Sequence, residues 1–220
     1  MPRRSDVKNV DEAVQDLLCQ ALETELGGVA VYEMAVLCAD HDELRREWRR
    51  YLEQTVRHVE IVRGMLDALG LDPEATTPGR PIVRAKGQAL VNVMRKALKD
   101  APASAALVAA ECVVDAETKD HQNWELIGEL AKASEGELAR ILTEAYEEVE
   151  LEEDEHLYHT RGWCRELGLA QLGLPAVMPP PEEEEDVRSA AEAARVERDR
   201  KAPAKADGGR KASRTEARRA

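Results

Sequence analysis

Four segments of the chain carry an apolar stripe with the spacing of an α-helix. In residues 11–39, 43–69, 103–132 and 135–167, apolar side chains recur at alternating intervals of three and four residues. This spacing places them on one helical face, which must be buried against another helix. Because only a few residues separate the first segment from the second and the third from the fourth, we expect the members of each of these pairs to be antiparallel neighbours. The sequence therefore predicts an all-α protein built as an antiparallel four-helix bundle.

Acids and imidazoles interrupt all four stripes. Each hairpin places its interruptions at a similar distance from its turn, so at 1.5 Å per residue they meet at one height. Burying ionised carboxylates costs several kcal/mol each unless they are paired or bound to a cation, and few lysines or arginines point inward. A divalent metal ion resolves this conflict, because carboxylates and neutral imidazoles both ligate it. The predicted metal ligands are Glu25, His58, Glu117, His121, Glu152, Glu153 and His156.

The rest of the chain divides around this bundle. Residues 71–81 read as a loop, and residues 82–99 as an extra helix in the crossover between the two hairpins. The predicted domains are an N-terminal arm over 1–10, the bundle over 11–172, and a Pro/Glu-rich linker with a mixed-charge tail over 173–220. We expect the tail to be disordered, with a charged helix over 188–201 that lacks an apolar face.

Composition limits the partners. The net charge of −13 argues against nucleic acid on the main surface, although a basic C-terminal end leaves weak contact open. The four cysteines form no CxxC pair, and no long apolar run or leader is visible. We therefore expect reduced thiols in a cytoplasmic protein that does not enter a membrane, with a homodimer left open.

The ordered motifs resemble the ferritin-like superfamily of di-iron carboxylate proteins. Glu25 precedes Leu26 and Tyr32, Glu117 lies seven residues before Trp124, and residues 153–156 form a complete Glu-x-x-His. The run YLEQTVRHVEIVRGMLDALG is most similar to stress-associated ferritin-like proteins of poorly known function. The resemblance implies two iron ions, with manganese or zinc as alternatives, and Glu153 as the motif acid, whereas Glu152 fits the stripe better.

Two functions remain open on the sequence. One is a redox-active protein that uses its metal ions in oxygen or peroxide chemistry, or sequesters metal under stress. The other is a non-enzymatic bundle with a degenerate or structural metal site that serves as an interaction module. Thr55 stands where the family has a second-helix glutamate, which favours the second function. The inward histidines favour the first, and His159 is expected either to support a ligand of the site or to stack near Trp163.

Overall fold

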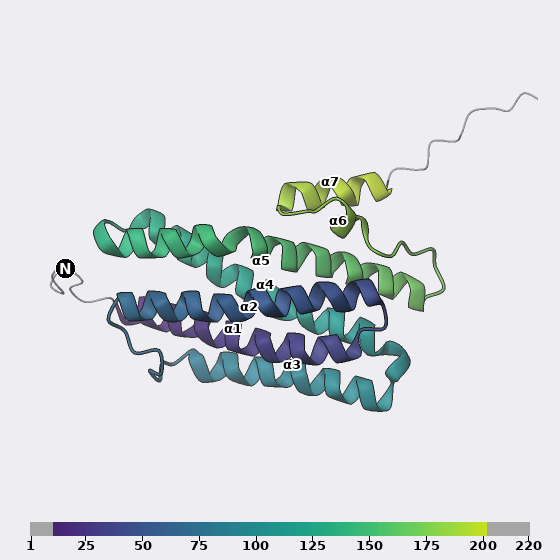
Figure 1. The fold of residues 1–220 in the computed structure, drawn as a ribbon, viewed down its shortest axis with the longest axis horizontal. Coiled ribbons are helices and arrows are strands. Elements are labelled where there is room, and N and C mark those ends of the chain that lie inside the picture. The colour runs from purple at the N-terminus through teal and green to yellow at the C-terminus, as the bar shows by residue number, and fades with distance from the viewer. Residues whose placement is uncertain (1–10, 202–220) are drawn as a thin grey trace, which may run out of the picture.

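The computed structural model describes residues 11–201, and every regular element among them is helical (Figure 1). The predicted all-α class is confirmed, and the five predicted long helices are present to within a few residues. Among residues 11–201, none of the helices combines the length and the apolar character that crossing a membrane requires. The elements are α1 (Glu12–Cys38), α2 (Asp42–Ala68), α3 (Arg80–Asp100), the short 3₁₀ helix η1 (Pro102–Ser104), α4 (Ala105–Ala133), α5 (Gly136–Gln171), α6 (Pro181–Glu184) and α7 (Ala190–Lys201).

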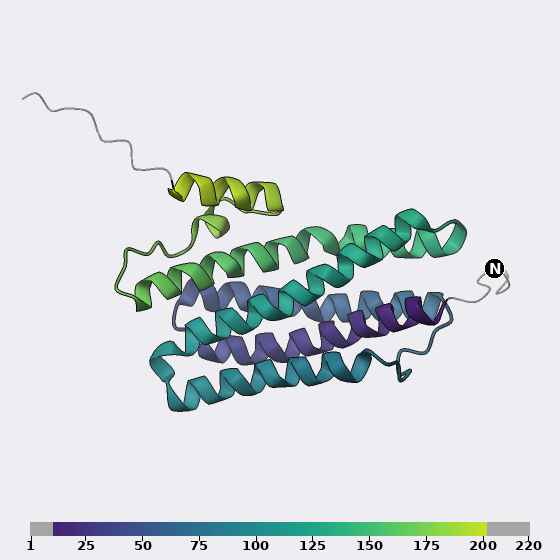
Figure 2. The ribbon, with the colours of Figure 1, turned by 180° about the vertical axis from the view of Figure 1, so that it is seen from behind.

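The long helices pack side by side in two hairpins. Short links join α1 to α2 and α4 to α5, so the members of each pair run in opposite directions (Figures 1 and 2). Helix α1 also packs on α4, and α2 packs on α5. Helix α3 returns along the molecule against α1 and α4, which is the expected crossover helix.

Local chemistry sets the helix ends. The side chain of Asp11 caps α1 by accepting a hydrogen bond from the backbone N–H of Ala13 at 3.2 Å. Beyond α2, Gly70 adopts a left-handed conformation with φ of 72°, and the N–H of Leu71 returns to the carbonyl of Leu66 at 2.8 Å. This is a helix stop that glycine permits without steric strain.

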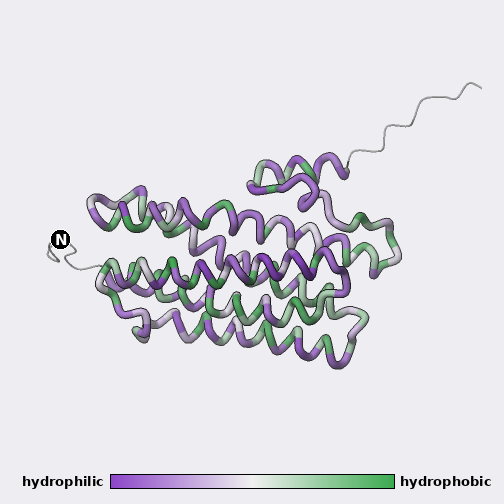
Figure 3. The backbone as a smooth tube through the Cα atoms, in the orientation of Figure 1, coloured by the Kyte–Doolittle hydropathy of each residue, from purple (hydrophilic) through white to green (hydrophobic). Residues whose placement is uncertain are grey.

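The core consists of two apolar clusters separated along the helix axes. The first contains Tyr32, Trp48, Tyr51 and Trp163, and the second contains Leu18, Leu22, Val62, Trp124 and Leu142. Each fully buried leucine or valine contributes about 1.5–3 kcal/mol by leaving water. Hydrophobic and hydrophilic residues are intermixed along each long helix (Figure 3). The buried polar residues Glu25, His58, Glu117, Glu153 and His156 belong to neither apolar cluster.

The C-terminal segment departs from the prediction. Helices α6 and α7 lie against α5 (Figure 1), and Val187 and Val196 are buried with Leu157 and Tyr158. The helix over 190–201 therefore has an apolar contact that its charged composition did not signal. We call residues 181–201 the strap. The expected disorder over 202–220 and the arm over 1–10 lie outside the described residues, and the domain division stays a prediction.

Candidate metal centre

Six titratable side chains from four helices meet between the two apolar clusters. Each is at most 5% exposed. On α4 and on α5 the participating residues are three apart, which puts both on one helical face. We call this set the central cluster: Glu25 of α1, His58 of α2, Glu117 and Asp120 of α4, and Glu153 and His156 of α5.

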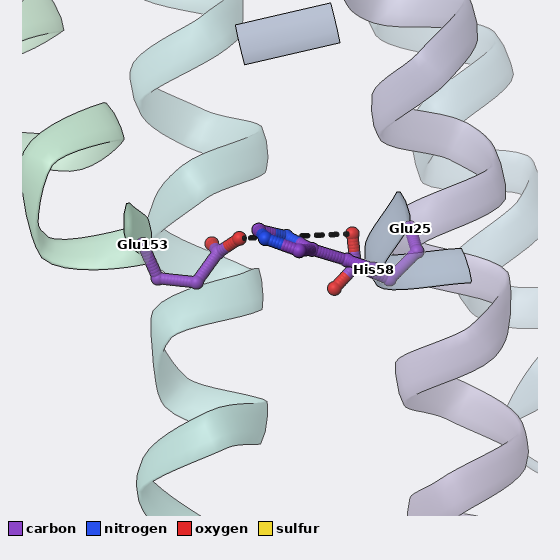
Figure 4. A group of neighbouring side chains, drawn as sticks. All are labelled: Glu25, His58 and Glu153. Carbon is purple, nitrogen blue, oxygen red and sulfur yellow. Dashed lines mark ion pairs between the residues drawn. The ribbon is translucent and has the colours of Figure 1, made fainter. Parts of the chain in front are cut away.

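One part of the central cluster joins three helices through an imidazole. His58 Nδ1 lies 2.8 Å from Glu153 Oε1 and 3.8 Å from Glu25 Oε2. Figure 4 shows the ring of His58 between the two carboxylates. One donor atom from each residue falls within 4.8 Å of the others, which is close enough for all three to share one ion.

A second part lies beside it and uses the same glutamate. His156 Nδ1 lies 3.7 Å from Glu117 Oε2 and 3.7 Å from Glu153 Oε1. Glu117, Glu153 and His156 again present donor atoms within 4.8 Å of one another. Because Glu153 belongs to both groups, the geometry gives two adjacent candidate cation positions with one shared carboxylate.

The central cluster leaves many of its buried polar atoms without a hydrogen bond. Such an atom costs about 1–3 kcal/mol, and more if it is charged. The contact of His58 Nδ1 with Glu153 is short, but its orientation does not form a hydrogen bond. All six residues contribute one such atom: Glu25 Oε2, His58 Nδ1, Glu117 Oε2, Asp120 Oδ1, Glu153 Oε2 and His156 Nδ1.

Partners outside the cluster orient both histidines. His58 Nε2 lies 2.8 Å from Glu152 Oε2, and His156 Nε2 lies 3.0 Å from Gln54 Oε1. If each Nε2 carries the proton and donates to its oxygen, each Nδ1 lone pair faces the central cluster. Metal-binding histidines are held in this way by acceptors behind the ring.

Crowding of acids changes the titration of the cluster. Burial, followed by the charge of Glu117, raises the pKa of Asp120 to about 7. Burial and the charges of Asp120 and Glu153 raise the pKa of Glu25 well above its usual range. The pKa of Glu153 is raised in the same direction by burial, Asp120 and Glu117. A bound cation favours the ionised forms, so its binding releases protons.

Two of the predicted ligands lie away from the central cluster. The side chain of His121 is 25% exposed, and its Nδ1 is 3.2 Å from Asp154 Oδ1. The side chain of Glu152 is also 25% exposed, pairs with Arg57 and supports His58 from behind. In both cases the neighbouring residue on the helix, Asp120 or Glu153, points inward instead.

Helix α2 lacks a carboxylate at Thr55, and Asp120 of α4 adds one to the central cluster. Thr55 is buried, and its hydroxyl donates to the carbonyl of Tyr51 at 2.8 Å, so α2 supplies no carboxylate at that position. Asp120, the neighbour of the predicted ligand His121 on α4, is buried inside the cluster close to Glu25 and Glu117. Its signal in the sequence was its position three residues after Glu117.

A second buried polar group lies nearer the strap. Glu47 Oε1 accepts a hydrogen bond from the Tyr51 hydroxyl at 2.5 Å and lies 3.0 Å from His159 Nδ1. The indole N–H of Trp163 lies 2.7 Å from Glu47 Oε2 and also 2.7 Å from Glu183 Oε2. We call Glu47, Tyr51, His159, Trp163 and Glu183 the end cluster. His159 therefore acts beside Trp163, but on Glu47 rather than on the central cluster.

The donor set suits a divalent ion. Carboxylates with imidazoles are accepted by iron, manganese and zinc, and the unpartnered atoms lie where ligand atoms are required. Free cysteines contribute no ligand to these groups. In comparisons with known proteins, no family model, no curated protein and no solved structure matched the chain.

Proposed function

We propose that this chain is a ferritin-like metal-binding protein whose central cluster holds two divalent ions, with iron as the resident metal. The observation that carries the proposal is the set of six unpartnered donor atoms, one from each residue of the cluster. An ion-free chain gains nothing from burying them together. Two cations sharing Glu153 offset that cost for acids on three helices and for both imidazoles.

The chain's own residues have distinct parts in this function. Glu25 and His58 would hold one ion, Glu117 and His156 the other, and Glu153 both. Bound iron supplies one-electron chemistry with oxygen or peroxide. The apolar clusters on either side limit access of water to the ions, which strengthens every charge interaction in the layer.

A second function is metal retention without turnover. The observation that favours it is Thr55, which leaves α2 with an imidazole but no carboxylate beside the cluster. With fewer acids to bridge the ions, the site would hold a structural ion such as zinc or manganese, and the protein would act as an interaction module under stress. The two functions differ in whether a bound ion reacts, and the interaction module is also compatible with a degenerate site that holds no ion.

Metal analysis of the full-length protein without a histidine tag tests the proposal. We expect two ions per chain after loading with iron(II), and an increase in near-ultraviolet absorbance on exposure to air. Full loading without any absorbance change would favour metal retention. A protein that binds no iron, manganese or zinc at micromolar concentration and melts at the same temperature with and without them would contradict the proposed metal site and favour the non-enzymatic bundle with a degenerate site.

A further inference from the structure

The surface of α4 and α5 has a pocket that reaches the central cluster from outside. Its volume is about 240 Å³, and residues of both helices line it, with Ala190 of the strap at its edge. Glu153, the residue shared by the two candidate ion positions, is one of the lining residues. The pocket therefore joins solvent to the acid on which the proposed function most depends.

The lining groups become steadily more buried toward Glu153. The side-chain exposure falls from 64% at Glu125 to 25% at His121, 14% at Asp154 and 2% at Glu153. His121 links the outer groups, because its Nε2 lies 3.6 Å from Glu125 Oε1 and its Nδ1 lies 3.2 Å from Asp154 Oδ1. The carboxylates and the imidazole that line the pocket thus range from exposed, at Glu125, to buried, at Glu153.

Acidic side chains outnumber basic ones in the lining of the pocket, where His121 is the one basic residue. Glu125, Glu150, Glu153 and Asp154 line it, and no lysine or arginine does. Four other pockets in the described part of the chain each include a lysine or an arginine. A cleft with an excess of acids between low-dielectric walls concentrates cations.

The innermost group provides an independent sign of a ligand. Glu153 Oε2 is buried and has no hydrogen-bond partner. Surface acids alone do not define a site, but here they lead to a buried oxygen that lacks a donor. Trp124, also in the lining, donates its indole N–H to Glu25 Oε1 at 3.0 Å, so the wall of the pocket extends to the other side of the cluster.

We propose that this pocket is the uptake port for the divalent cation, with Glu125, His121 and Asp154 as transient ligands that pass the ion to Glu153. This inference rests on the proposed function, because the port serves the central cluster. It also assigns a role to His121, whose imidazole lies outside the two candidate ion positions.

Loading kinetics distinguish a port from a resting site. Cobalt(II) is mixed without oxygen with ion-free full-length protein, and the visible absorbance of bound cobalt is followed in a stopped-flow instrument. The rate reports access, and the final amplitude reports occupancy of the central cluster. We expect the His121→Ala/Glu125→Gln double variant to load about tenfold more slowly than the unaltered chain, within the range found for electrostatic steering. Its final amplitude should match that of the unaltered chain.

Glu129→Gln provides the matched control. Glu129 lies one turn beyond Glu125 on α4, is also exposed, and pairs with Lys132 outside the pocket. Glu129→Gln removes one carboxylate charge, as Glu125→Gln does, but outside the pocket. The loading rate of the Glu129→Gln variant should therefore equal that of the unaltered chain. Added salt should slow loading of the unaltered chain and of Glu129→Gln more than that of the double variant, because screening weakens the pull of the acids.

Each contrary result has its own meaning. A double variant that loads as fast as Glu129→Gln and to full amplitude would overturn the port while leaving the metal site intact. A double variant with a reduced final amplitude would make these residues resting ligands and would also overturn the port. An unaltered chain that gives no cobalt signal would contradict the proposed function, and the port would be overturned with it.

Discussion

The central cluster and the end cluster both bury glutamates and histidines, but the pKa values of their buried glutamates shift in opposite directions. In the end cluster, Glu47 receives hydrogen bonds from Tyr51 and Trp163 and faces His159. Burial favours a raised pKa for Glu47, but the hydrogen bonds from His159, Glu183 and Tyr51 outweigh it and lower the pKa. In the central cluster, Glu25 and Glu153 face other acids, and their pKa values rise well above the usual range.

Helix α1 repeats this contrast within two residues. Glu23 is buried, yet Arg80 and Arg84 both donate to its carboxylate, at 2.9 Å and 2.7 Å. Those bonds overcome the effect of burial and lower the pKa of Glu23. Within residues 11–201, Glu25 has one donor, Trp124, and no lysine or arginine partner. The surrounding groups, rather than burial itself, therefore decide which acids are satisfied by the protein and which would gain from a cation.

The largest expected effect is a rise in melting temperature on metal binding, which should depend on the central cluster and not on the end cluster. Saturating iron(II) or manganese(II) should stabilise the unaltered chain by about 4 kcal/mol for each of the two ions at a free concentration a thousand times the dissociation constant. For a chain of this size, that is roughly a 10 °C rise in the melting temperature for each ion. Glu153→Gln should lose most of this rise, since the amide no longer bridges both ion positions. Differential scanning calorimetry without oxygen measures both.

Glu47→Gln is the matched variant for this prediction. It neutralises an equally buried glutamate in the end cluster, so its response to metal should equal that of the unaltered chain. Equal melting shifts in all three proteins would show that the ion binds elsewhere. Loss of the shift in Glu47→Gln alone would place the ion in the end cluster.

Without metal, the two clusters should respond to neutralisation with opposite signs. Asp120→Asn should stabilise the ion-free protein by about 2 kcal/mol at pH 8, because it removes a buried acid whose pKa the fold raises to about 7. Glu47→Gln should destabilise it by about 2 kcal/mol, because an amide cannot accept from all the donors around it. Urea unfolding in the presence of a chelator measures both changes.

The pH dependence gives this prediction a second check. Unfolded Asp120 titrates near the ordinary pKa of about 4, whereas the folded chain keeps its proton up to about 7. The folded state therefore binds more protons between these values, and the stability that this proton provides is lost as the pH rises through 7. The advantage of Asp120→Asn should grow over that interval. An advantage that stays constant from pH 5 to pH 8 would contradict the raised pKa.

The sequence was sufficient for the helices and for most of the central cluster. The stripes located four of the five long helices, and Glu25, His58, Glu117, Glu153 and His156 lie inside as expected. These residues were readable because each interrupts an otherwise apolar face, so its direction follows from its neighbours. Whether they bind a metal, and which one, stays a prediction.

The sequence did not identify which of two adjacent residues on a helix faces the core, because both positions fit the helical period. Spacings of 117 to 120 and of 117 to 121 both fit 3.6 residues per turn, so the pattern did not separate Asp120 from His121. The same ambiguity applied to Glu152 and Glu153 in a run of acids. Only the packing of neighbouring helices fixes the rotation, and it buries Asp120 and Glu153.

The end cluster was missed for a different reason. Glu47 lies among charged residues at the start of α2, and its partner Glu183 is more than 130 positions away in a segment expected to be disordered. No local period links them. The strap also covers the outer face of α5, where Glu155 and Tyr158 are buried in spite of positions outside the apolar stripe. The contacts that the strap makes with α5 explain this burial, and the spacing of apolar residues in α5 does not predict it.

The smallest expected effect concerns how the strap holds to the end cluster. Burial and the hydrogen bond with Glu47 raise the pKa of Glu183 to about 8. A docked strap thus keeps a proton that a released strap loses in the ordinary glutamate range. Docking is favoured by this proton below about pH 4, and the contribution is lost as the pH rises through 8. Ionised Glu183 then faces the carboxylate of Glu47.

Hydrogen exchange over residues 181–201 measures this opening between pH 6 and pH 9, after correction for the intrinsic effect of pH. We expect protection of the strap to fall by about 1 kcal/mol across that range, since Glu183 is only half-buried and solvent screens its charge. Glu183→Gln cannot ionise and should keep its protection. Glu184→Gln changes an exposed neighbour and should behave as the unaltered chain does.

If Glu183→Gln loses protection as steeply as Glu184→Gln, the ion pairs of Arg165 with Glu182 and of Arg188 with Glu155 control the strap instead. The two clusters would then differ only in the central one's need for a cation.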